Sequence, residues 1–329
     1  MTTIEVIGLG ALNIDHLYQV ECILVDGEAV VNKADSSPGG SAANTIYGLA
    51  KLEANTGAMG VVGDDAEGKA SIQDFQKVGV DTSQIKIKPG AKTGSVLCLS
   101  DRLGKRSLYV MPGANNLLTL DDLDLTYINR AKILHISSFA DDRQFKILLE
   151  LMGRLDSSIK VSFAPGVLHS TKRLKALTPI LAKTYVLFIN RDELKHLTGE
   201  DVISGAEICL KQGCHIVAVT LGKGMRLELG NGTSQREVTA SSYIRDAANE
   251  YVIEATNRNI ISGVDTTGAG DAFATGFIYG LLKGKRLEEC GRLGDIAARF
   301  SISKIGARES LPTLSELAKR YRELYSEQL

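Results

Sequence analysis

The sequence reads Asp265-Thr266-Thr267-Gly268-Ala269-Gly270-Asp271 where a short apolar run, residues 260–264, gives way to apolar residues at helical spacing. The run predicts a strand, and the later residues predict a helix that ends near Gly284. A helix that begins at this turn leaves several backbone N–H groups without intrahelical partners, and its dipole adds partial positive charge. The stretch therefore predicts a strand–turn–helix unit whose turn can bind a phosphate group.

The same turn carries the residue types that phosphoryl transfer needs. Gly268, Ala269 and Gly270 let the backbone approach a charged ligand closely, and Asp271 is a first-turn carboxylate that can accept a proton. An ordinary tight turn with a favourable first-turn aspartate explains the same residues, so the rest of the chain must decide between the two interpretations. The stretch is not a Walker A loop, because no Gly-Lys-Ser/Thr follows it.

The composition is that of an ordinary globular protein. The chain has 329 residues, of which 44% are apolar and 23% charged, and its formal net charge is -1. Aromatic residues are scarce and tryptophan is absent, which favours the aliphatic core of a layered α/β fold. Because there is no basic excess, we expect neither nucleic acid nor an anionic membrane as a partner.

Targeting and metal-binding patterns are missing from the sequence. No apolar run approaches the ~20 residues of a membrane span, and the N-terminus shows no signal-peptide pattern. The five cysteines form no Cys-x-x-Cys pair, and the five histidines show no metal-ligand spacing. We therefore expect a cytoplasmic protein with structural or free thiols.

Strand-like apolar runs alternate with helical patterns through most of the chain. This alternation predicts a mostly parallel sheet that is covered by helices on both faces. No repeat or proline-rich linker divides the chain, so we expect one α/β domain over residues 1–329. The predicted strands are 4–9, 131–136, 159–163, 185–189 and 216–221, and the predicted helices include 144–155, 174–181 and a C-terminal helix that begins with a capping box at Thr313.

Two stretches, 15–37 and 93–111, lack helical periodicity and predict hairpins with turns at Asp26-Gly27 and near Gly104. Small strands inserted at separate points of an α/β chain often pack together as a flap. A flap over a site could exclude water, which protects a phosphate donor from hydrolysis. Ordinary edge hairpins are the alternative.

The N-terminal run 4–10, Ile-Glu-Val-Ile-Gly-Leu-Gly, is similar to the start of a dinucleotide-binding fingerprint, which would indicate a nicotinamide-dependent oxidoreductase. The fingerprint fails, because Asn13 stands at its third glycine and no helix obviously follows. Asn13 and Asp15 instead share one face of an extended segment. An amide beside a carboxylate suits two neighbouring sugar hydroxyls, although a polar strand end is an equally simple explanation.

Three further motifs follow along the chain. Residues 38–44, Pro-Gly-Gly-Ser-Ala-Ala-Asn, permit close backbone approach to a ligand, but a glycine pair before a helix is weak evidence alone. Asn190 and Glu193 follow a predicted strand, where they fit either a capping box or the hydration shell of Mg²⁺. Residues 217–224 predict a strand that ends in a glycine loop, which is where ligands bind at a parallel sheet.

Taken in this order, the chain resembles the ribokinase-like, or PfkB, family of carbohydrate and nucleoside kinases. The motifs are Asn-x-Asp, Gly-Gly-Ser-x-x-Asn, Asn-x-x-Glu, Thr-x-Gly-x-Gly and Asp-Thr-Thr-Gly-Ala-Gly-Asp. The resemblance implies a doubly wound, three-layer α/β fold with a small β lid, which the stretches 15–37 and 93–111 would supply. It also implies ATP and Mg²⁺ as cofactors and a small-molecule sugar or nucleoside as substrate.

The resemblance carries roles onto individual residues. Asp271 would take the proton from the attacking hydroxyl, and Gly268, Ala269 and Gly270 would form the anion hole for the transferring phosphate. The residues that would hold the sugar are Asn13, Asp15, Gly39, Gly40, Ser41 and Asn44. The residues that would line the nucleotide are Asn190, Thr220, Gly222 and Gly224, with Glu193 on magnesium through water.

Members of the family often bind a monovalent cation beside the anion hole, so K⁺ is a further implied cofactor. The matching positions, mostly through backbone carbonyls, are Asp265, Thr267, Ser301, Lys304 and Gly306.

The substrate is less closely defined. Asn13 and Asp15 are similar to the ribose-holding pair of ribokinases, whereas Ser41 replaces the lysine that ribokinases usually carry and is closer to nucleoside kinases. Because both substrate groups contain ribose, we predict phosphorylation of its primary 5-hydroxyl.

Two alternatives to this function remain open. One is a sugar-phosphate or keto-deoxy sugar kinase, in which Arg102, Lys105 and Arg106 on the lid would bind the substrate phosphate. The other is a non-catalytic sugar or nucleotide sensor. We also expect that a homodimer could form through the lid.

Overall fold

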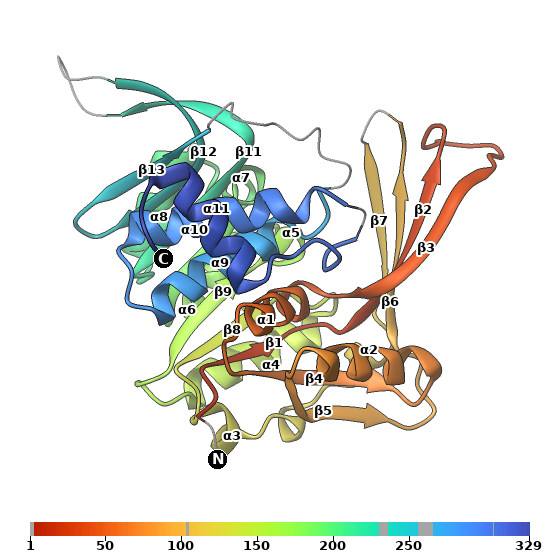
Figure 1. The fold of residues 1–329 in the computed structure, drawn as a ribbon. Coiled ribbons are helices and arrows are strands. Elements are labelled where there is room, and N and C mark those ends of the chain that lie inside the picture. Colours follow the sequence, from red (N-terminus) through yellow and green to blue (C-terminus); the bar gives the residue numbers. More distant parts are fainter. Residues whose placement is uncertain (1–2, 103–104, 230–235, 256–265, 305) are drawn as a thin grey trace.

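A nine-stranded, mostly parallel β-sheet forms the centre of the protein (Figure 1). The computed structural model describes residues 3–102, 105–229, 236–255, 266–304 and 306–329. The strands of this sheet are β1 (Val6–Leu9), β4 (Thr56–Gly63), β5 (Asp81–Lys88), β8 (Ile133–Ser137), β9 (Lys160–Ala164), β10 (Thr184–Asn190), β11 (Ile216–Leu229), β12 (Arg236–Asp246) and β13 (Glu250–Glu254).

The strand order is β13-β12-β11-β10-β9-β8-β1-β4-β5. Pairing is parallel from β5 through to β11, and β12 and β13 extend one edge in antiparallel pairing. The chain proceeds from β1 outward to β4 and β5, and then resumes at β8 on the other side of β1. The carboxyl ends of β1 and β8 therefore flank a topological switch point, where open α/β sheets bind their ligands.

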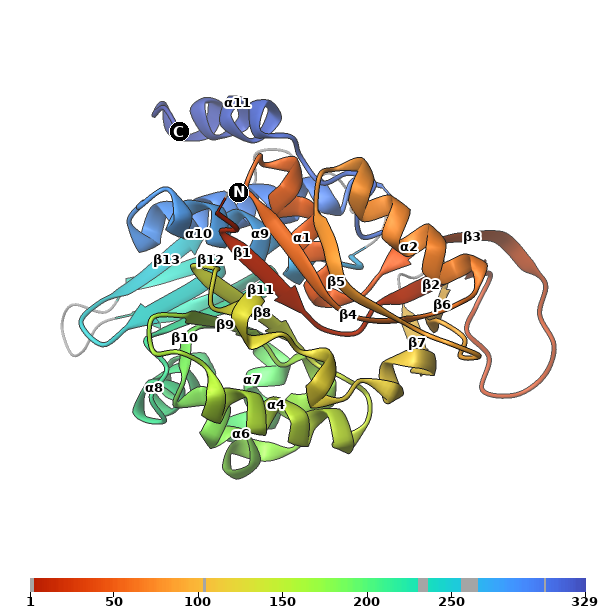
Figure 2. The ribbon, with the colours of Figure 1, turned by 90° about the horizontal axis from the view of Figure 1, so that it is seen from below.

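Helices cover both faces of the sheet, as the sequence predicts (Figure 2). In β10, Val186 and Phe188 pack into the apolar cluster of one face, whereas Leu187 and Ile189 pack into that of the other. One face carries α1 (Ser41–Lys51), α2 (Ala66–Lys77), α9 (Ala269–Leu282), α10 (Leu287–Ser301) and α11 (Leu314–Tyr325). The other carries α3 (Leu125–Ile128), α4 (Asp142–Arg154), α5 (Gly166–Ser170), α6 (Arg173–Leu181), α7 (Arg191–Thr198) and α8 (Val202–Lys211).

Close packing fixes α9, the helix predicted to follow the Asp-Thr-Thr-Gly-Ala-Gly-Asp stretch. A Cβ atom at Gly276 would lie 2.3 Å from the carbonyl oxygen of Leu293 on α10, so no larger residue fits there without moving the helices. On the sheet side, the Phe277 ring meets the Phe188 ring of β10 edge-on, with the ring centroids 5.2 Å apart. The N-terminus of α9 is therefore held at a defined place over the sheet.

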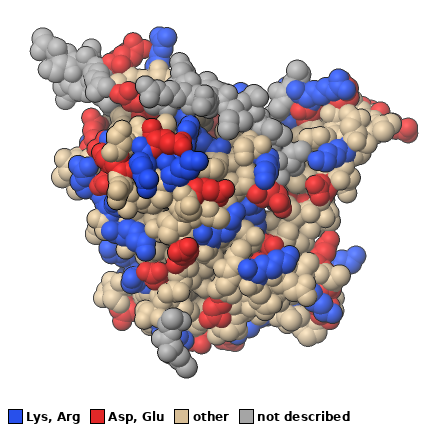
Figure 3. Space-filling view, in the orientation of Figure 1, with Lys and Arg blue, Asp and Glu red and all other residues tan. Residues whose placement is uncertain are grey.

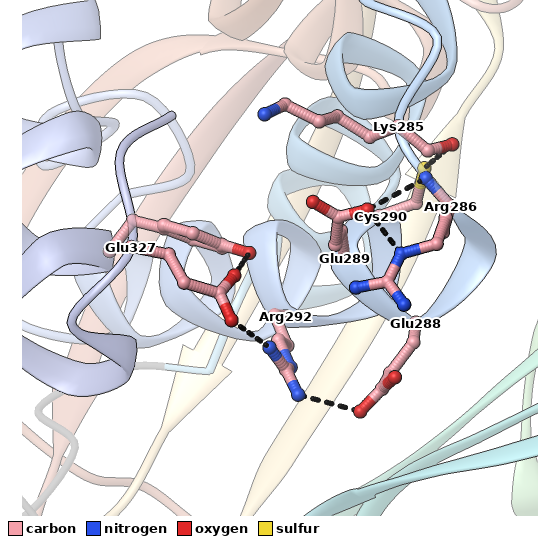
Figure 4. A network of polar contacts seen from close by, with 8 residues as sticks. Lys285, Arg286, Glu288, Glu289, Cys290, Arg292 and Glu327 are labelled. Atoms are coloured by element: carbon pink, nitrogen blue, oxygen red, sulfur yellow. Dashed lines mark hydrogen bonds and ion pairs between the residues drawn. The ribbon is translucent and has the colours of Figure 1, made fainter.

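The C-terminal helix α11 is anchored on α10. It begins with the capping box predicted at Thr313. Arg292 of α10 pairs with Glu288 at 2.6 Å and with Glu327 at 3.6 Å (Figure 4), and its guanidinium lies over the Tyr325 ring, 4.5 Å from the centroid. The segment after α11 is thus tied back to the body by charge as well as by apolar contact.

A second, four-stranded sheet projects from the body (Figure 1). Its strands are β2 (Asn13–Val20), β3 (Val31–Gly39), β6 (Gly94–Ser100) and β7 (Arg106–Met111), in the order β3-β2-β6-β7. Both predicted hairpins pair in antiparallel fashion, and the parallel pairing of β2 with β6 joins them. Asp26-Gly27 lies in the β2–β3 connection, and the turn predicted near Gly104 lies outside the described residues.

The structure corrects one predicted loop. Residues 221–224 do not end the strand that begins at Ile216: β11 continues to Leu229, and these residues form a bulge where the register shifts between Thr220 and Met225. The sequence misleads here because positive φ at Gly222 (63°) and Gly224 (110°) serves a bulge as well as a loop. The strand predicted over 260–264 lies outside the described residues.

The charge distribution on the face shown in Figure 3 is mixed, with Lys and Arg interspersed among Asp and Glu. Among the described residues, no helix combines the length and the apolar character that crossing a membrane requires.

Candidate active site

The first turn of α9 forms one wall of the candidate site. Gly268 precedes the helix with a left-handed φ of 75°, which brings the chain against Ala307; a Cβ atom on Gly268 would lie 2.6 Å from the Ala307 Cβ. The amide of Ala269 donates to the Thr266 carbonyl at 3.3 Å. Among the described residues, nothing accepts a hydrogen bond from the amides of Gly270 and Asp271. Two backbone donors therefore remain available to an anion at this helix start.

The Asp271 carboxylate lies at the centre of the site. Its Oδ1 accepts a hydrogen bond from Ser41 Oγ at 2.7 Å, and its Oδ2 accepts one from Asn44 Nδ2 at 2.9 Å. Burial raises the pKa of Asp271 to about 6, against the opposing effect of these two hydrogen bonds and of the Arg308 charge. The group is therefore ionised at neutral pH, yet basic enough to take a proton.

The residues predicted to hold a sugar meet at the base of the four-stranded sheet. Asn13 pairs with Gly39 on β3 and with Gly94 on β6. The Asp15 carboxylate lies directly over Gly39, where a Cβ atom would fall 2.3 Å from Asp15 Oδ2. Gly39 is therefore required for this close approach. Gly40, with φ of 100°, precedes α1, which begins at Ser41.

Asn115 supports this group, although the sequence analysis did not select it. Its Nδ2 donates to Asn13 Oδ1 at 3.0 Å, and its Oδ1 accepts from the amide of Leu12 at 2.9 Å. The side chain is buried, so it fixes the orientation of the Asn13 amide. Residues 113–117 form a short 3₁₀ helix whose polar composition resembles any surface turn, and nothing in it signals a buried contact.

Arg308 and Asp74 are two further residues that sequence reasoning missed. Arg308 Nε donates to Asn44 Oδ1 at 2.9 Å, and its Nη1 pairs with Asp74 Oδ2 at 2.8 Å. Arg308 Nη2 donates to the Gly39 carbonyl at 3.3 Å. Together with Asp15 over Gly39, these contacts join the sugar-side residues and Asp271 into one polar cluster. A lone arginine in sequence is typical of a solvated surface, so no pattern could have revealed it.

Asn190 and Glu193, the residues predicted for the nucleotide and for magnesium, lie at the start of α7. Asn190 Oδ1 accepts from the Glu193 amide at 2.9 Å, and the Asn190 amide donates to Glu193 Oε2 at 3.2 Å, which makes a capping box. The pKa of Glu193 is raised by burial and by the charge of Asp271, so the two carboxylates lie within electrostatic reach of each other. Thr220 pairs with Asn190 across the sheet, which places β11 beside them. The bulge with Gly222 and Gly224 follows directly.

The predicted monovalent-cation residues are only partly brought together. The Thr267 hydroxyl accepts from Arg106 Nη1 at 2.8 Å, and the Ser301 carbonyl accepts from the Ser310 hydroxyl at 2.9 Å. Lys304 is exposed, Gly306 is buried with φ of 94°, and Asp265 lies outside the described residues. Neither hydrogen bond indicates a bound cation.

Comparison with known proteins assigns the family. The model of the family described as "pfkB family carbohydrate kinase" matches residues 1–314. The chain belongs to the PfkB family. It is therefore a phosphotransferase that acts on a sugar or a nucleoside, as the resemblance implies.

Relatives and solved structures agree with this assignment. An uncharacterized sugar kinase from Archaeoglobus fulgidus is 36% identical over 266 residues, which is 80% of this chain and 98% of the relative. A cytidine kinase from Thermococcus kodakarensis is 31% identical over 306 residues, covering 92% of this chain and 98% of the relative. Among solved structures, a ribokinase from Arabidopsis thaliana superposes with a TM-score of 0.79 at 23% identity, over 97% of this chain and 98% of that one. The last comparison bears on the fold alone and confirms the ribokinase-like architecture.

Proposed function

We propose that this PfkB kinase transfers the γ-phosphate of ATP to the primary 5-hydroxyl of ribose or of a ribonucleoside. The observation that carries the proposal is the placement of Asp271: a carboxylate held by two side-chain donors in the first turn of α9, beside two amides for which the described residues supply no acceptor. A base and an anion-binding helix start thus share one location, which is what in-line transfer to a hydroxyl requires.

The transfer would proceed in one step. Asp271 accepts the proton of the 5-hydroxyl as that oxygen bonds to the γ-phosphorus, and the bond from the γ-phosphorus to the bridging oxygen of ADP breaks. The amides of Gly270 and Asp271 hold the charge on the transferring group. Asn13 and Asp15 hold the neighbouring ring hydroxyls and so aim the 5-hydroxyl at the base. Positioning and charge stabilisation therefore supply most of the rate.

ATP is proposed as donor because the similar Arabidopsis ribokinase was solved with ribose and ATP. Asn190, Thr220, Gly222 and Gly224 lie together along β10 and β11, where a nucleotide could lie across the sheet edge. Magnesium fits near Glu193, because that carboxylate and Asp271 place two negative charges close together. When bound, Mg²⁺ would neutralise phosphate charge, with Glu193 holding its water. The described contacts of Thr267 and Ser301 lend the potassium site no support.

A substrate panel tests the proposal directly. Purified protein is assayed for ADP release with ribose, ribonucleosides, fructose phosphates and keto-deoxy sugars, with and without K⁺. We expect turnover only with substrates that carry a free ribosyl 5-hydroxyl. Turnover of a phosphorylated sugar, with failure of every furanoside, would reverse the substrate assignment. ADP release with any acceptor excludes the non-catalytic sensor.

The second candidate function, a kinase of a phosphorylated sugar, is favoured by one contact. Arg106 Nη1 reaches Thr267 in the loop before α9, so a cation from the four-stranded sheet lies beside the anion-binding turn. Arg102 pairs with Glu21 at 2.8 Å on the exposed side of that sheet. Replacement of Arg106 by glutamine separates the two functions: a selective rise in KM for a phosphorylated acceptor supports the second, and an unchanged KM for ribose is expected from the first.

The predicted homodimer through the four-stranded sheet is also retained as a proposal. The edge strand β7 exposes four successive apolar residues, Leu108, Tyr109, Val110 and Met111. An exposed apolar edge strand is a ready partner for a second strand. A second copy of this sheet would cover both the edge and its apolar side chains.

A further inference from the structure

Arg308 is the most deeply enclosed cation near the site, at 5% exposure. Its guanidinium carbon lies over the Tyr47 ring and over the Phe75 ring, 5.1 Å and 4.9 Å from their centroids. A buried cation is tolerated when it is paired, and Asp74 of α2 supplies the counter-charge at 2.8 Å. The guanidinium is thus held by two aromatic rings and one carboxylate, and its Nε donates to Asn44 of α1.

The contact with α1 decides the orientation of one amide. Asn44 Oδ1 accepts from Arg308 Nε, so the amide nitrogen of Asn44 must point to the other side, where it donates to Asp271 Oδ2. The flipped amide would set donor against donor at the guanidinium and acceptor against acceptor at the carboxylate. Arg308 therefore selects the amide orientation that serves Asp271.

We propose that Arg308 is a positioning residue for the Asp271 carboxylate, and that it acts through the Asn44 amide. The proposal rests on the proposed role of Asp271 as the base. Asp74 anchors the guanidinium, the guanidinium orients the amide, and the amide holds Oδ2, while Ser41 holds Oδ1. The carboxylate is in this way kept ionised and fixed in direction despite its burial.

Two charged side chains outside α9 affect the ionisation of the Asp271 carboxylate in opposite directions. Arg308 itself contributes a positive charge that favours the ionised carboxylate. Glu193 of α7 contributes a negative charge within electrostatic reach of Asp271. Loss of the guanidinium fork alone therefore removes the donor orientation, and loss of the whole side chain removes a favourable charge as well, while the repulsion from Glu193 remains.

The test compares R308K with the matched variant R292K. Arg292 also pairs with carboxylates, Glu288 and Glu327 (Figure 4), and its guanidinium lies over the Tyr325 ring, so it joins α10 to the C-terminal segment instead of to the turn before α9. Lysine keeps the charge without the fork. We expect R308K to shift the acid limb of the kcat–pH profile to higher pH by up to about one unit, which lowers kcat about fivefold at pH 6. R292K is expected to change the thermal unfolding temperature alone.

A double-mutant cycle isolates the route through Asn44. In an N44A background there is no amide to orient, so R308K should cause little further loss of kcat. An undiminished effect of R308K in that background overturns the proposal. A wild-type pH profile in R308K, with only a lower unfolding temperature, also overturns it. If R308K does not fold, D74N takes its place, because it weakens the ion pair that holds Arg308. The acid limb of its kcat–pH profile must then move to higher pH.

The D271N variant distinguishes this inference from the proposed function. Near-normal turnover in D271N removes the base assignment itself. An inactive D271N, combined with an unmoved profile in R308K and D74N, leaves the base in place and rejects Arg308 as its positioning residue.

Discussion

Ser41 Oγ donates a hydrogen bond of 2.7 Å to Asp271 Oδ1 across 230 positions of sequence. The contact joins the first residue of α1 to the first turn of α9, so two helix starts meet at one carboxylate. The usual ribokinase lysine would place a full positive charge at position 41, whereas Ser41 offers a neutral donor. The ionised state of Asp271 therefore depends more heavily on its other neighbours here.

Replacement of Asp271 by asparagine should abolish most of the activity and leave the fold intact. A correctly placed base contributes about 10² to 10⁴ in rate, so kcat should fall by at least the lower bound. ADP release gives kcat, and the unfolding temperature checks the fold. Nucleotide binding by D271N, measured by calorimetry, should remain near that of the wild type; its loss would point to a structural role.

The raised pKa of Asp271, about 6 instead of its usual 3.8, predicts two pH effects. The rate should rise with pH through about 6, as the carboxylate ionises, and then level. The contribution of this group to stability has the opposite sign, because the folded state holds the proton more tightly. That contribution is complete below about 3.8 and is lost as the pH rises through about 6. The unfolding temperature of the wild type minus that of D271N should therefore decrease between pH 4 and pH 7.

Replacement of Gly270 by valine should lower activity without loss of stability. Among the described residues, nothing lies within 4 Å of a Cβ atom at Gly270, so we expect the added side chain to enter the open space beside the first turn of α9. G153V on α4 is the matched control, because Gly153 is likewise unobstructed but remote from the site. We expect a loss of kcat in G270V only. Equal kinetics in both variants would argue against an anion at this helix start.

Replacement of Asn115 by alanine should raise the KM for the acceptor. It frees the Asn13 amide and leaves the buried Leu12 amide without its acceptor, which costs about 1–3 kcal/mol of stability. Q144A is the control: Gln144 is buried and donates to the Asn116 carbonyl at 2.9 Å, and among the described residues no hydrogen bond joins it to a predicted sugar residue. Both variants should lose stability, and only N115A should change KM.

Replacement of Tyr109 by lysine should weaken self-association through β7. The Tyr109 side chain is 57% exposed on the edge strand, and a charge there disfavours strand pairing between two copies. Val167 on α5, at 56% exposure, offers the control variant V167K. Light scattering after size exclusion should show a smaller species for Y109K alone. A wild-type mass for Y109K would place any dimer elsewhere.

The sequence predicted the layered fold well, because strand and helix periods are local signals. The starts of β1, β8, β9, β10 and β11 lie within two residues of the predicted strands. The capping box at Thr313 was also legible, since its two partners are three residues apart. The bulge at Gly222 was not, because a positive φ in β11 has the same sequence signature as a loop.

The candidate site was predictable only where its residues sit in short motifs. Asp271, Ser41 and Asn44 were selected from glycine-rich helix starts, and the structure brings them into contact. Arg308 and Asn115 escaped selection, because each acts through contacts with residues more than 100 positions away. Tertiary partners of this kind leave no periodicity or spacing to detect.

The ladder between β2 and β3 runs down to the pair Asn13 and Gly39. Asn13 and Asp15, which are predicted to hold the sugar, are thus part of a strand of the projecting sheet itself. A tilt of the four-stranded sheet as a rigid unit would therefore move Asn13 and Asp15 with it. Binding of an acceptor by these two side chains and movement of the four-stranded sheet are consequently coupled, so an acceptor that bridges Asn13 and Asp15 fixes the orientation of that sheet relative to the nine-stranded one.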